Sequence, residues 1–297
     1  MISVIMPAYN RAHVITKAIN SVLHQTFTQF ELIIVNDCST DATLEIINSF
    51  SDNRIILINA SKNRGAAAAR NLGIKNAKYA IVSLLDSDDF YEPTFLEESY
   101  HLLKNTNEQI GFMWTGLKTI NNNKITFSHW EPPFIKSNYI TFLHALHIGT
   151  NSGISIKKFV FEKCGYFNES LPAAEDTDFF LRITQEFGYT FTHNQLININ
   201  KSGEDRLSKN YSKIATAYNI FIDQHLSVIN KYPKLQKKYF YKLMWLNYHL
   251  GKKEMARMYF QKLKKLQLLN VKSRRIYFLF EFFPLKLATY IHLKFGH

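Results

Sequence analysis

The sequence predicts an α/β fold with a mostly parallel sheet, flanked by helices and followed by a helical C-terminal extension. In the first hundred residues, short β-branched runs alternate with stretches that carry apolar residues at helical spacing. Three of the runs end in polar clusters, at Asn10, at Asp37 and at residues 86–89. Such strand–helix alternation requires right-handed crossovers and places helices on both faces of the sheet. The polar clusters would then meet at the carboxyl edge of the sheet.

The first hundred residues contain four predicted strands and three predicted helices. The strands are expected at residues 2–6, 30–35, 54–58 and 79–85, and the helices at residues 11–25, from Asp41 onward and at residues 66–77. Pro7 ends the first apolar run, which is typical of a buried parallel strand. Thr40 or Asp41 is the candidate N-cap of the second helix.

The pattern changes after residue 110. Residues 111–199 are predicted to form short strands and loops, with one helix around residues 175–187. Beyond Tyr211 the pattern is helical. Two predicted helices, at residues 237–250 and 252–266, form a hairpin with Gly251 as the C-cap between them.

Positive charge is concentrated in this helical part. The chain has a net charge of +12, from 36 Lys and Arg against 24 Asp and Glu. Residues 231–297 hold 16 of the basic and two of the acidic residues, so the first 230 residues are slightly acidic. A nucleic-acid-binding protein would spread its basic residues over the folded body, so we expect no nucleic-acid partner. The predicted units are residues 1–205, with halves 1–110 and 111–205, and a basic helical region, 206–297.

Cysteine usage and the absence of long apolar runs favour a cytoplasmic protein. Cys38 and Cys164 lie far apart without CxxC spacing, which argues against a zinc site or a disulfide framework. The N-terminus lacks the basic start and long apolar segment of a signal peptide. No apolar run reaches the roughly 18 residues that a membrane-spanning helix needs.

A dense acidic cluster follows the fourth predicted strand, as Asp86-Ser87-Asp88-Asp89. Carboxylates this close repel one another, and a divalent cation, which prefers hard oxygen ligands, relieves the repulsion. The alternative is a loop that caps the next helix, with Asp89 as N-cap. The location at a strand end, beside two other polar strand ends, favours the cation.

A second acidic pair, Glu175 and Asp176, precedes an apolar helical stretch. Such a carboxylate is a candidate general base. The alternative is that both acids merely stabilise the start of a helix, where the dipole favours negative charge. A base at this position would have a lowered pKa, unless burial or the neighbouring Glu175 and Asp178 offset the dipole.

Taken in order, the polar segments resemble glycosyltransferase family 2. The matching segments are residues 3–10, 21–26 with 30–37, 63–65 with 69–71, 86–89, and 165–169 followed by Glu175 and Asp176. Each segment alone is weak, but the ordered set from Ile2 to about Arg182 is highly specific. The resemblance implies the GT-A fold, in which a nucleotide-binding parallel sheet joins a smaller acceptor-binding part. Residues 1–110 and 111–205 would be these two halves.

The resemblance also implies roles for individual residues. The nucleotide-sugar-binding residues would be Pro7, Ala8, Tyr9, Asn10, Asp37, Asn63, Arg70, Asp86 and Ser87. Asp37 would accept a hydrogen bond from the base, and Asp86 would lie near the ribose and diphosphate. Asp88, with Asp86, would bind Mn²⁺ or Mg²⁺. Asp176, with Glu175 beside it, would deprotonate the acceptor.

Some of these assignments stay open. Either Arg64 or Arg70 would reach the nucleotide end, and Tyr9 would form a wall of the site or pack into the core. Family members often carry a second acid where this chain has Asn36, so one nucleoside contact is neutral here. The Q-x-x-R-W signature of processive synthases is absent, which favours transfer of a single sugar. His193 is a candidate further metal ligand, although a lone histidine is more often structural.

The C-terminal tail is basic and then aromatic over residues 274–283. With Lys286, His292, Lys294 and Phe295, it is predicted to form an interfacial helix on an anionic membrane. The alternative is that the aromatic side chains pack into the body. Membrane contact would suit a lipid-linked glycan acceptor and a peripheral location at the inner face of the cytoplasmic membrane.

The leading hypothesis is therefore an inverting, non-processive glycosyltransferase that uses a nucleotide sugar, preferably UDP-linked, and a glycan or lipid-linked glycan acceptor in surface polysaccharide or lipopolysaccharide synthesis. A sugar nucleotidyltransferase would need a Gly-rich, Arg-containing loop after the first strand, which Pro7-Ala8-Tyr9-Asn10-Arg11 does not supply. A non-catalytic nucleotide-binding or membrane-binding module is disfavoured because both acidic clusters are intact.

Overall fold

The computed structural model describes residues 1–121, 124–132, 135–145, 150–201 and 210–295. The chain divides into two units. The first contains residues 1–169 and 175–204, and the second contains residues 170–174 and 205–297. The predicted boundary at residue 205 falls within residues 202–209, outside the described residues.

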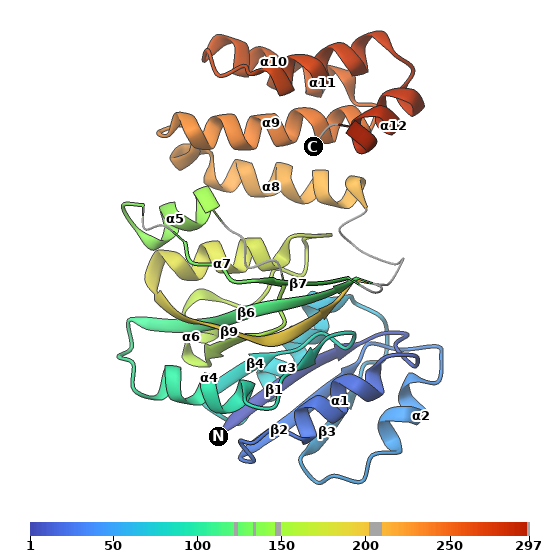
Figure 1. Ribbon diagram of the computed structural model, residues 1–297, viewed down its shortest axis with the longest axis vertical. Coiled ribbons are helices and arrows are strands. Elements are labelled where there is room, and N and C mark those ends of the chain that lie inside the picture. Colours follow the sequence, from blue (N-terminus) through green and yellow to red (C-terminus); the bar gives the residue numbers. More distant parts are fainter. Residues whose placement is uncertain (122–123, 133–134, 146–149, 202–209, 296–297) are drawn as a thin grey trace. The chain divides into compact units, whose positions relative to one another are not determined.

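The first unit is built on one mixed sheet, whose strands run in the order β3-β2-β1-β4-β8-β6-β9-β5, with β7 paired to β6 (Figure 1). The strands are β1 (Ile2–Ala8), β2 (Phe30–Asn36), β3 (Ile55–Asn59), β4 (Ile81–Leu84), β5 (Phe90–Tyr91), β6 (Ile110–Asn121), β7 (Lys124–Ser128), β8 (Ile154–Lys157) and β9 (Gly188–Asn200). The first four strands of this order are parallel, as predicted, and β9 is parallel to β6. β8 is antiparallel to both β4 and β6.

The second half of the sheet differs from the prediction of short strands and loops. β6 has 12 residues and β9 has 13, which makes them the longest strands described. Their pairing shifts register between Ile110 and Phe112 and again around Gly116. Such irregularities break the period of two by which a strand is recognised in a sequence.

Helices cover both faces of the sheet. They are α1 (Ile15–Leu23), α2 (Thr43–Asn48), α3 (Ala66–Asn76), α4 (Phe95–Lys104), α5 (Asn138–Ala145), α6 (Phe159–Cys164) and α7 (Glu175–Glu186). Val4 and Met6 of β1 share a buried cluster with α1 and α4. Ile5 points to the opposite face, where a Cβ atom on Gly73 of α3 would lie 2.5 Å from its Cγ2 atom. α3 therefore needs glycine there to approach the sheet closely.

The predicted N-cap of α2 was wrong, and the alternative in which Asp89 caps the next helix does not hold either. The N-cap of α2 is Ala42, because Asp41 Oδ1 accepts the N–H of Thr43 from one residue further out. The N-cap of α4 is Thr94, so Asp89 does not cap this helix.

The second unit is helical, as predicted. Its helices are α8 (Tyr211–Ile229), α9 (Pro233–His249), α10 (Lys253–Lys265), α11 (Val271–Phe282) and α12 (Leu285–Phe295). Gly251 has φ of +72°, and its N–H donates to the Tyr248 carbonyl while that of Lys252 donates to the Asn247 carbonyl. This pair of bonds is a Schellman motif and confirms the predicted hairpin. Among the described residues, no helix is both long and apolar enough to cross a bilayer.

Candidate active site

The loops that follow β1 and β2 are fastened together by Asn10. Its side-chain oxygen accepts the N–H of Thr40 at 2.8 Å, and its own N–H donates to the hydroxyl of Ser39 at 3.1 Å. Asn10 has φ of +52°, a left-handed conformation that asparagine tolerates better than most residues. Because β1 and β2 are parallel and in register, both loops lie at the carboxyl edge of the sheet.

Asp37 fastens the loop after β2 to the start of α3. Its buried carboxylate accepts the backbone N–H groups of Arg64, at 3.0 and 3.2 Å, and of Gly65, at 2.8 Å. Gly65 precedes α3 with φ of +87° and ψ of 168°, a combination essentially confined to glycine. The carboxylate is thus held in place by the backbone that it binds.

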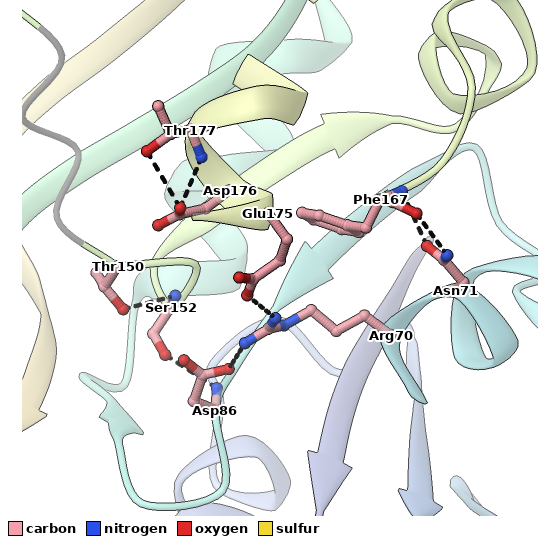
Figure 2. A network of polar contacts seen from close by, with 9 residues as sticks. All are labelled: Arg70, Asn71, Asp86, Thr150, Ser152, Phe167, Glu175, Asp176 and Thr177. Carbon is pink, nitrogen blue, oxygen red and sulfur yellow. Dashed lines mark hydrogen bonds and ion pairs between the residues drawn. The ribbon is translucent and has the colours of Figure 1, made fainter. Parts of the chain in front are cut away.

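Arg70 of α3 lies between two carboxylates (Figure 2). Its guanidinium donates to Asp86 Oδ1 at 2.6 Å and to Glu175 Oε1 at 2.9 Å. Its side chain is only 5% exposed, against 27% for Asp86 and 14% for Glu175. Burial lowers the pKa of this guanidinium, but the two carboxylates outweigh burial and raise it above its ordinary value. Arg70 therefore remains charged and joins the end of β4 to the start of α7.

Ser152 organises the acidic loop after β4. Its hydroxyl accepts the N–H of Asp86 at 2.9 Å and donates to Asp89 Oδ2 at 2.6 Å. Asp89 Oδ1 accepts the N–H of Asn200. Burial, and then the charges of Asp86 and Asp88, raise the pKa of Asp89 well above its ordinary value. Through these two bonds, Asp89 joins the acidic loop to Ser152 and to the end of β9.

Glu175 and Asp176 occupy the first turn of α7. Asp176 Oδ1 accepts the N–H of Thr177 at 2.6 Å (Figure 2). Burial, followed by the negative charge of Glu175, raises the pKa of Asp176 to about 6. The helix terminus does not hold this carboxyl at an unusually low pKa, because burial outweighs the bonds to Thr177.

The segment that leads into α7 is held by amide and guanidinium groups. Asn71 of α3 exchanges hydrogen bonds with the backbone of Phe167 and donates to Glu169 Oε1 at 2.9 Å. Arg182 of α7 binds Asp178 and the carbonyl of Tyr166. Through Asn71, the matching segment at residues 69–71 contacts the matching segment at residues 165–169.

The remaining predicted residues lie at the ends of strands β1 and β4 and in the loop after β3. Pro7 and Ala8 are buried at the end of β1, and Ser87 is buried within the acidic loop. Tyr9 is 42% exposed and is not part of the core. Asn63 is exposed. Of the two candidate arginines, Arg70 contacts the acidic loop. The guanidinium of Arg64 instead forms an ion pair with exposed Glu169.

Ser152, Asn71 and Arg182 were not predicted as site residues, although Asn71 lies in the matching segment 69–71. Ser152 carried a usable signal, because Asn151-Ser152-Gly153 is a polar triplet directly before an apolar strand. The functions of the other two depend on contacts across about 96 and 16 residues of chain, which no local pattern reveals.

The acidic loop contains carboxylate oxygens, which are the kind of ligand that a divalent cation prefers. Asp86 and Asp88 are half-buried carboxylates. Burial, and then the charges of these two groups, raise the pKa of Asp89, so negative charge is crowded there. Searched over the described residues, the chain has no group of three or more His, Cys, Asp or Glu side chains that could hold a metal. A cation here would need further oxygen ligands from a bound diphosphate. His193 lies 3.3 Å from Glu131, and its ring centroid is 4.7 Å from that of His129.

The chain is similar in sequence to known proteins. The family model described as glycosyl transferase family 2 matches residues 3–165. A UDP-Glc:alpha-D-GlcNAc-diphosphoundecaprenol beta-1,3-glucosyltransferase of Escherichia coli is 34% identical over 181 residues, which cover 61% of this chain and 68% of that protein. Across the first four curated relatives, the matched segments cover 63–68% of their lengths.

Two solved structures have the same fold. The S. aureus TarS fragment 1–349 in complex with UDP-GlcNAc has a TM-score of 0.62 at 18% identity, covering 89% of this chain and 91% of that one. A mannosyltransferase from Pyrobaculum calidifontis, in complex with GDP-Man and Mn²⁺, has a TM-score of 0.58 at 15% identity, covering 98% and 86%. The chain belongs to glycosyl transferase family 2, and its enzyme class is that of the glycosyltransferases.

Proposed function

We propose that the protein transfers one sugar, with inversion, from a UDP-linked donor to a hydroxyl group of a lipid-linked glycan. The acceptor hydroxyl loses its proton to Asp176, and its oxygen bonds to the anomeric carbon. The bond from that carbon to the diphosphate breaks, and the electron pair leaves with the diphosphate. The observation that supports this assignment most strongly is the buried Arg70 bridge, which joins the acidic loop to the helix that starts with Glu175 and Asp176.

Asp176 has the properties of a general base at neutral pH. A pKa of about 6 leaves it mainly ionised at pH 7.5 and still basic enough to accept a proton. Glu175 is a positioning residue in this account, because it holds Arg70 and its charge helps to raise the pKa of Asp176.

The nucleotide end of the donor would lie at the carboxyl ends of β1 and β2, near Tyr9 and Asp37. Asp88 and Asp86 would hold Mn²⁺ or Mg²⁺, which when bound supplies positive charge to the departing diphosphate. Arg70 adds a fixed positive charge on the protein side of the same loop.

The acceptor class rests on the relatives. The E. coli glucosyltransferase named above acts, by its name, on a GlcNAc-diphosphoundecaprenol and uses UDP-Glc. A lipid-linked acceptor requires contact with a membrane surface, and the basic α11 and α12 would provide it. The protein would then bind peripherally at the inner face of the cytoplasmic membrane.

A donor screen tests the proposal. Thermal unfolding of the full chain should be measured with UDP-Glc, UDP-GlcNAc and GDP-Man, each with and without Mn²⁺. A donor that binds the native state raises the unfolding temperature according to its concentration over its Kd. We expect a UDP-sugar to do so only with Mn²⁺. Stabilisation by GDP-Man alone, or by none of the three, would contradict the proposed donor.

A further inference from the structure

The second unit contains a pocket of about 450 Å³ between α9, α11 and α12. Its lining combines three basic side chains with aliphatic and aromatic ones. The lining residues are Tyr241, Lys272, Arg274, Arg275, Ile276, Phe278, Leu279, Phe283, Ile291 and His292. No carboxylate is among them, and over the described part of the chain no ion pair involves Lys272, Arg274 or Arg275.

Exposed apolar side chains occur on both α11 and α12, two of the helices that line this pocket. α11 buries Ile276 and Phe280, which lie four residues apart on one side of the helix. On the opposite side it exposes Phe278 and Phe282, which are also four residues apart. Phe278 is 57% exposed and Phe282 is 69% exposed. The first half of α12 also exposes Leu285, Leu287 and Tyr290. Basic and large apolar residues on one exposed face are typical of a helix that lies in a membrane interface.

We propose that this pocket docks a phosphate-headed phospholipid of an anionic bilayer. The phosphate would lie among Lys272, Arg274 and Arg275, and the start of the acyl chain would contact Phe278, Leu279 and Phe283. The exposed side chains of α11 and α12 would enter the surrounding interface. This proposal deepens the membrane association suggested above and is independent of the transfer reaction, so the two fail separately.

Charge and composition favour this occupant over two others. The phosphates of a nucleic acid could pair with the three basic side chains, and its nucleobases could stack on the aromatic rings. The aliphatic side chains Ile276, Leu279 and Ile291, however, offer no hydrogen bonds to a sugar–phosphate backbone or to nucleobase edges. A second copy of the chain would place the same patch against itself, so the unpaired bases would repel one another. A bilayer phosphate would pair with the basic side chains, and the lipid chains would cover the apolar side chains.

Vesicle sedimentation of the full chain tests the proposal. We expect binding to phosphatidylcholine vesicles that contain phosphatidylglycerol, weaker by at least tenfold to pure phosphatidylcholine, and reduced by added salt. Arg274→Glu with Arg275→Glu should weaken binding at least twentyfold, since each base contributes about fivefold near an anionic surface and each reversal adds repulsion. The matched control, Lys264→Glu with Lys265→Glu on α10, should weaken it less than threefold.

A second pair of variants tests the apolar contribution. Phe278→Ser with Phe282→Ser should weaken vesicle binding at least tenfold. Met255→Ser with Met258→Ser, which are exposed at 39% and 41% on α10, should leave it within threefold. Hydrogen exchange on the unmodified chain provides a readout without substitutions, because vesicles should slow exchange in residues 271–290 and not in residues 253–265.

Several outcomes would overturn the proposal. Equal losses from the α11 and α10 charge reversals would mean attraction by net charge alone. Competition by an oligonucleotide at equal phosphate concentration would indicate a nucleic-acid site, and a dimer broken by Phe278→Ser with Phe282→Ser would indicate a self-interface. Tenfold preference for polyprenyl phosphate over phosphatidylglycerol at equal charge would assign the pocket to the acceptor lipid instead of the bulk phospholipid.

Discussion

Arg70 donates a hydrogen bond to Glu175, 105 residues further along the chain, and this contact ties the start of α7 to α3. The same guanidinium also binds Asp86, so a single buried cation joins both acidic clusters. A buried ion pair is costly to break from one side, because the remaining charges lose their partner.

Arg70→Met should therefore destabilise the fold and reduce transfer. We expect a loss of about 2–3 kcal/mol in the free energy of unfolding, measured by urea titration, since Asp86 and Glu175, which are 27% and 14% exposed, would lose the buried cation between them. The control is Arg64→Met, whose pair with Glu169 is exposed and should contribute less than about 1 kcal/mol. Equal losses from the two variants would show that the Arg70 bridge has no special importance.

The pH dependence of transfer should follow Asp176. The base must be ionised, so kcat/KM should fall as the pH drops below about 6. Glu175→Gln should shift this fall to lower pH, because the charge of Glu175 helps to raise the pKa of Asp176. A profile that is flat from pH 7.5 to pH 5 would exclude Asp176 as the base.

The same pKa predicts a stability effect of opposite sense to the catalytic one. The folded-state pKa of Asp176 lies above the ordinary value of 3.8, so its contribution to stability is fully present below pH 3.8 and is lost as the pH rises through 6. Asp176→Asn should therefore raise the unfolding temperature at pH 7.5 and much less at pH 4. An unchanged unfolding temperature at pH 7.5 would mean that the carboxylate is not destabilised by burial.

Ser152→Ala should weaken donor binding as well as the fold. Without the hydroxyl, the Asp86 N–H and Asp89 lose a partner, so the acidic loop loses its fixed position. We expect about 1–2 kcal/mol of lost stability and at least tenfold weaker Mn²⁺-dependent donor binding by calorimetry. Ser155→Ala breaks a buried hydroxyl pair with Ser83 and should cost similar stability while leaving donor affinity unchanged. Equal donor affinities in the two variants would contradict the function given to Ser152.

Acid should destabilise the second unit at the hydrogen-bonded pair of His249 and His292. Burial, and then His292, lower the pKa of His249 to about 4, so its contribution to stability is lost as the pH falls from about 6.5 toward 4. Hydrogen exchange in α9 and α12 should therefore accelerate over this range. His249→Phe should remove much of the acceleration, and an unaltered acid response in that variant would assign it to other groups.

Much of the first sheet was predictable because its strands are local. β1 to β4 are short, apolar and separated by helices, so each leaves a clear signal, and the parallel order follows from that alternation. The polar clusters at Asn10, Asp37 and Asp86 were found for the same reason. The other site segments, residues 63–71 and 165–176, were found through their resemblance to family signatures. The hydrogen bond between Asn71 and Glu169 gives a physical reason why these two segments occur together.

What escaped prediction depends on distant contacts. The register shifts in β6 and β9 hid two long strands, and the bond from Ser152 to Asp89 spans 63 residues. The sequence left open whether the aromatic tail packs inward or faces outward. The structure contains both arrangements, because Phe280 is buried while Phe278 and Phe282 are exposed.

Comparison of donor binding with turnover in Asp176→Asn tests the central claim most directly. We predict that the variant binds the UDP-sugar with Mn²⁺ within threefold of the unmodified enzyme, while single-turnover transfer slows by about 10³-fold, the size of a general-base contribution. Full transfer by this variant, or loss of donor affinity as large as the loss of transfer, would contradict the account.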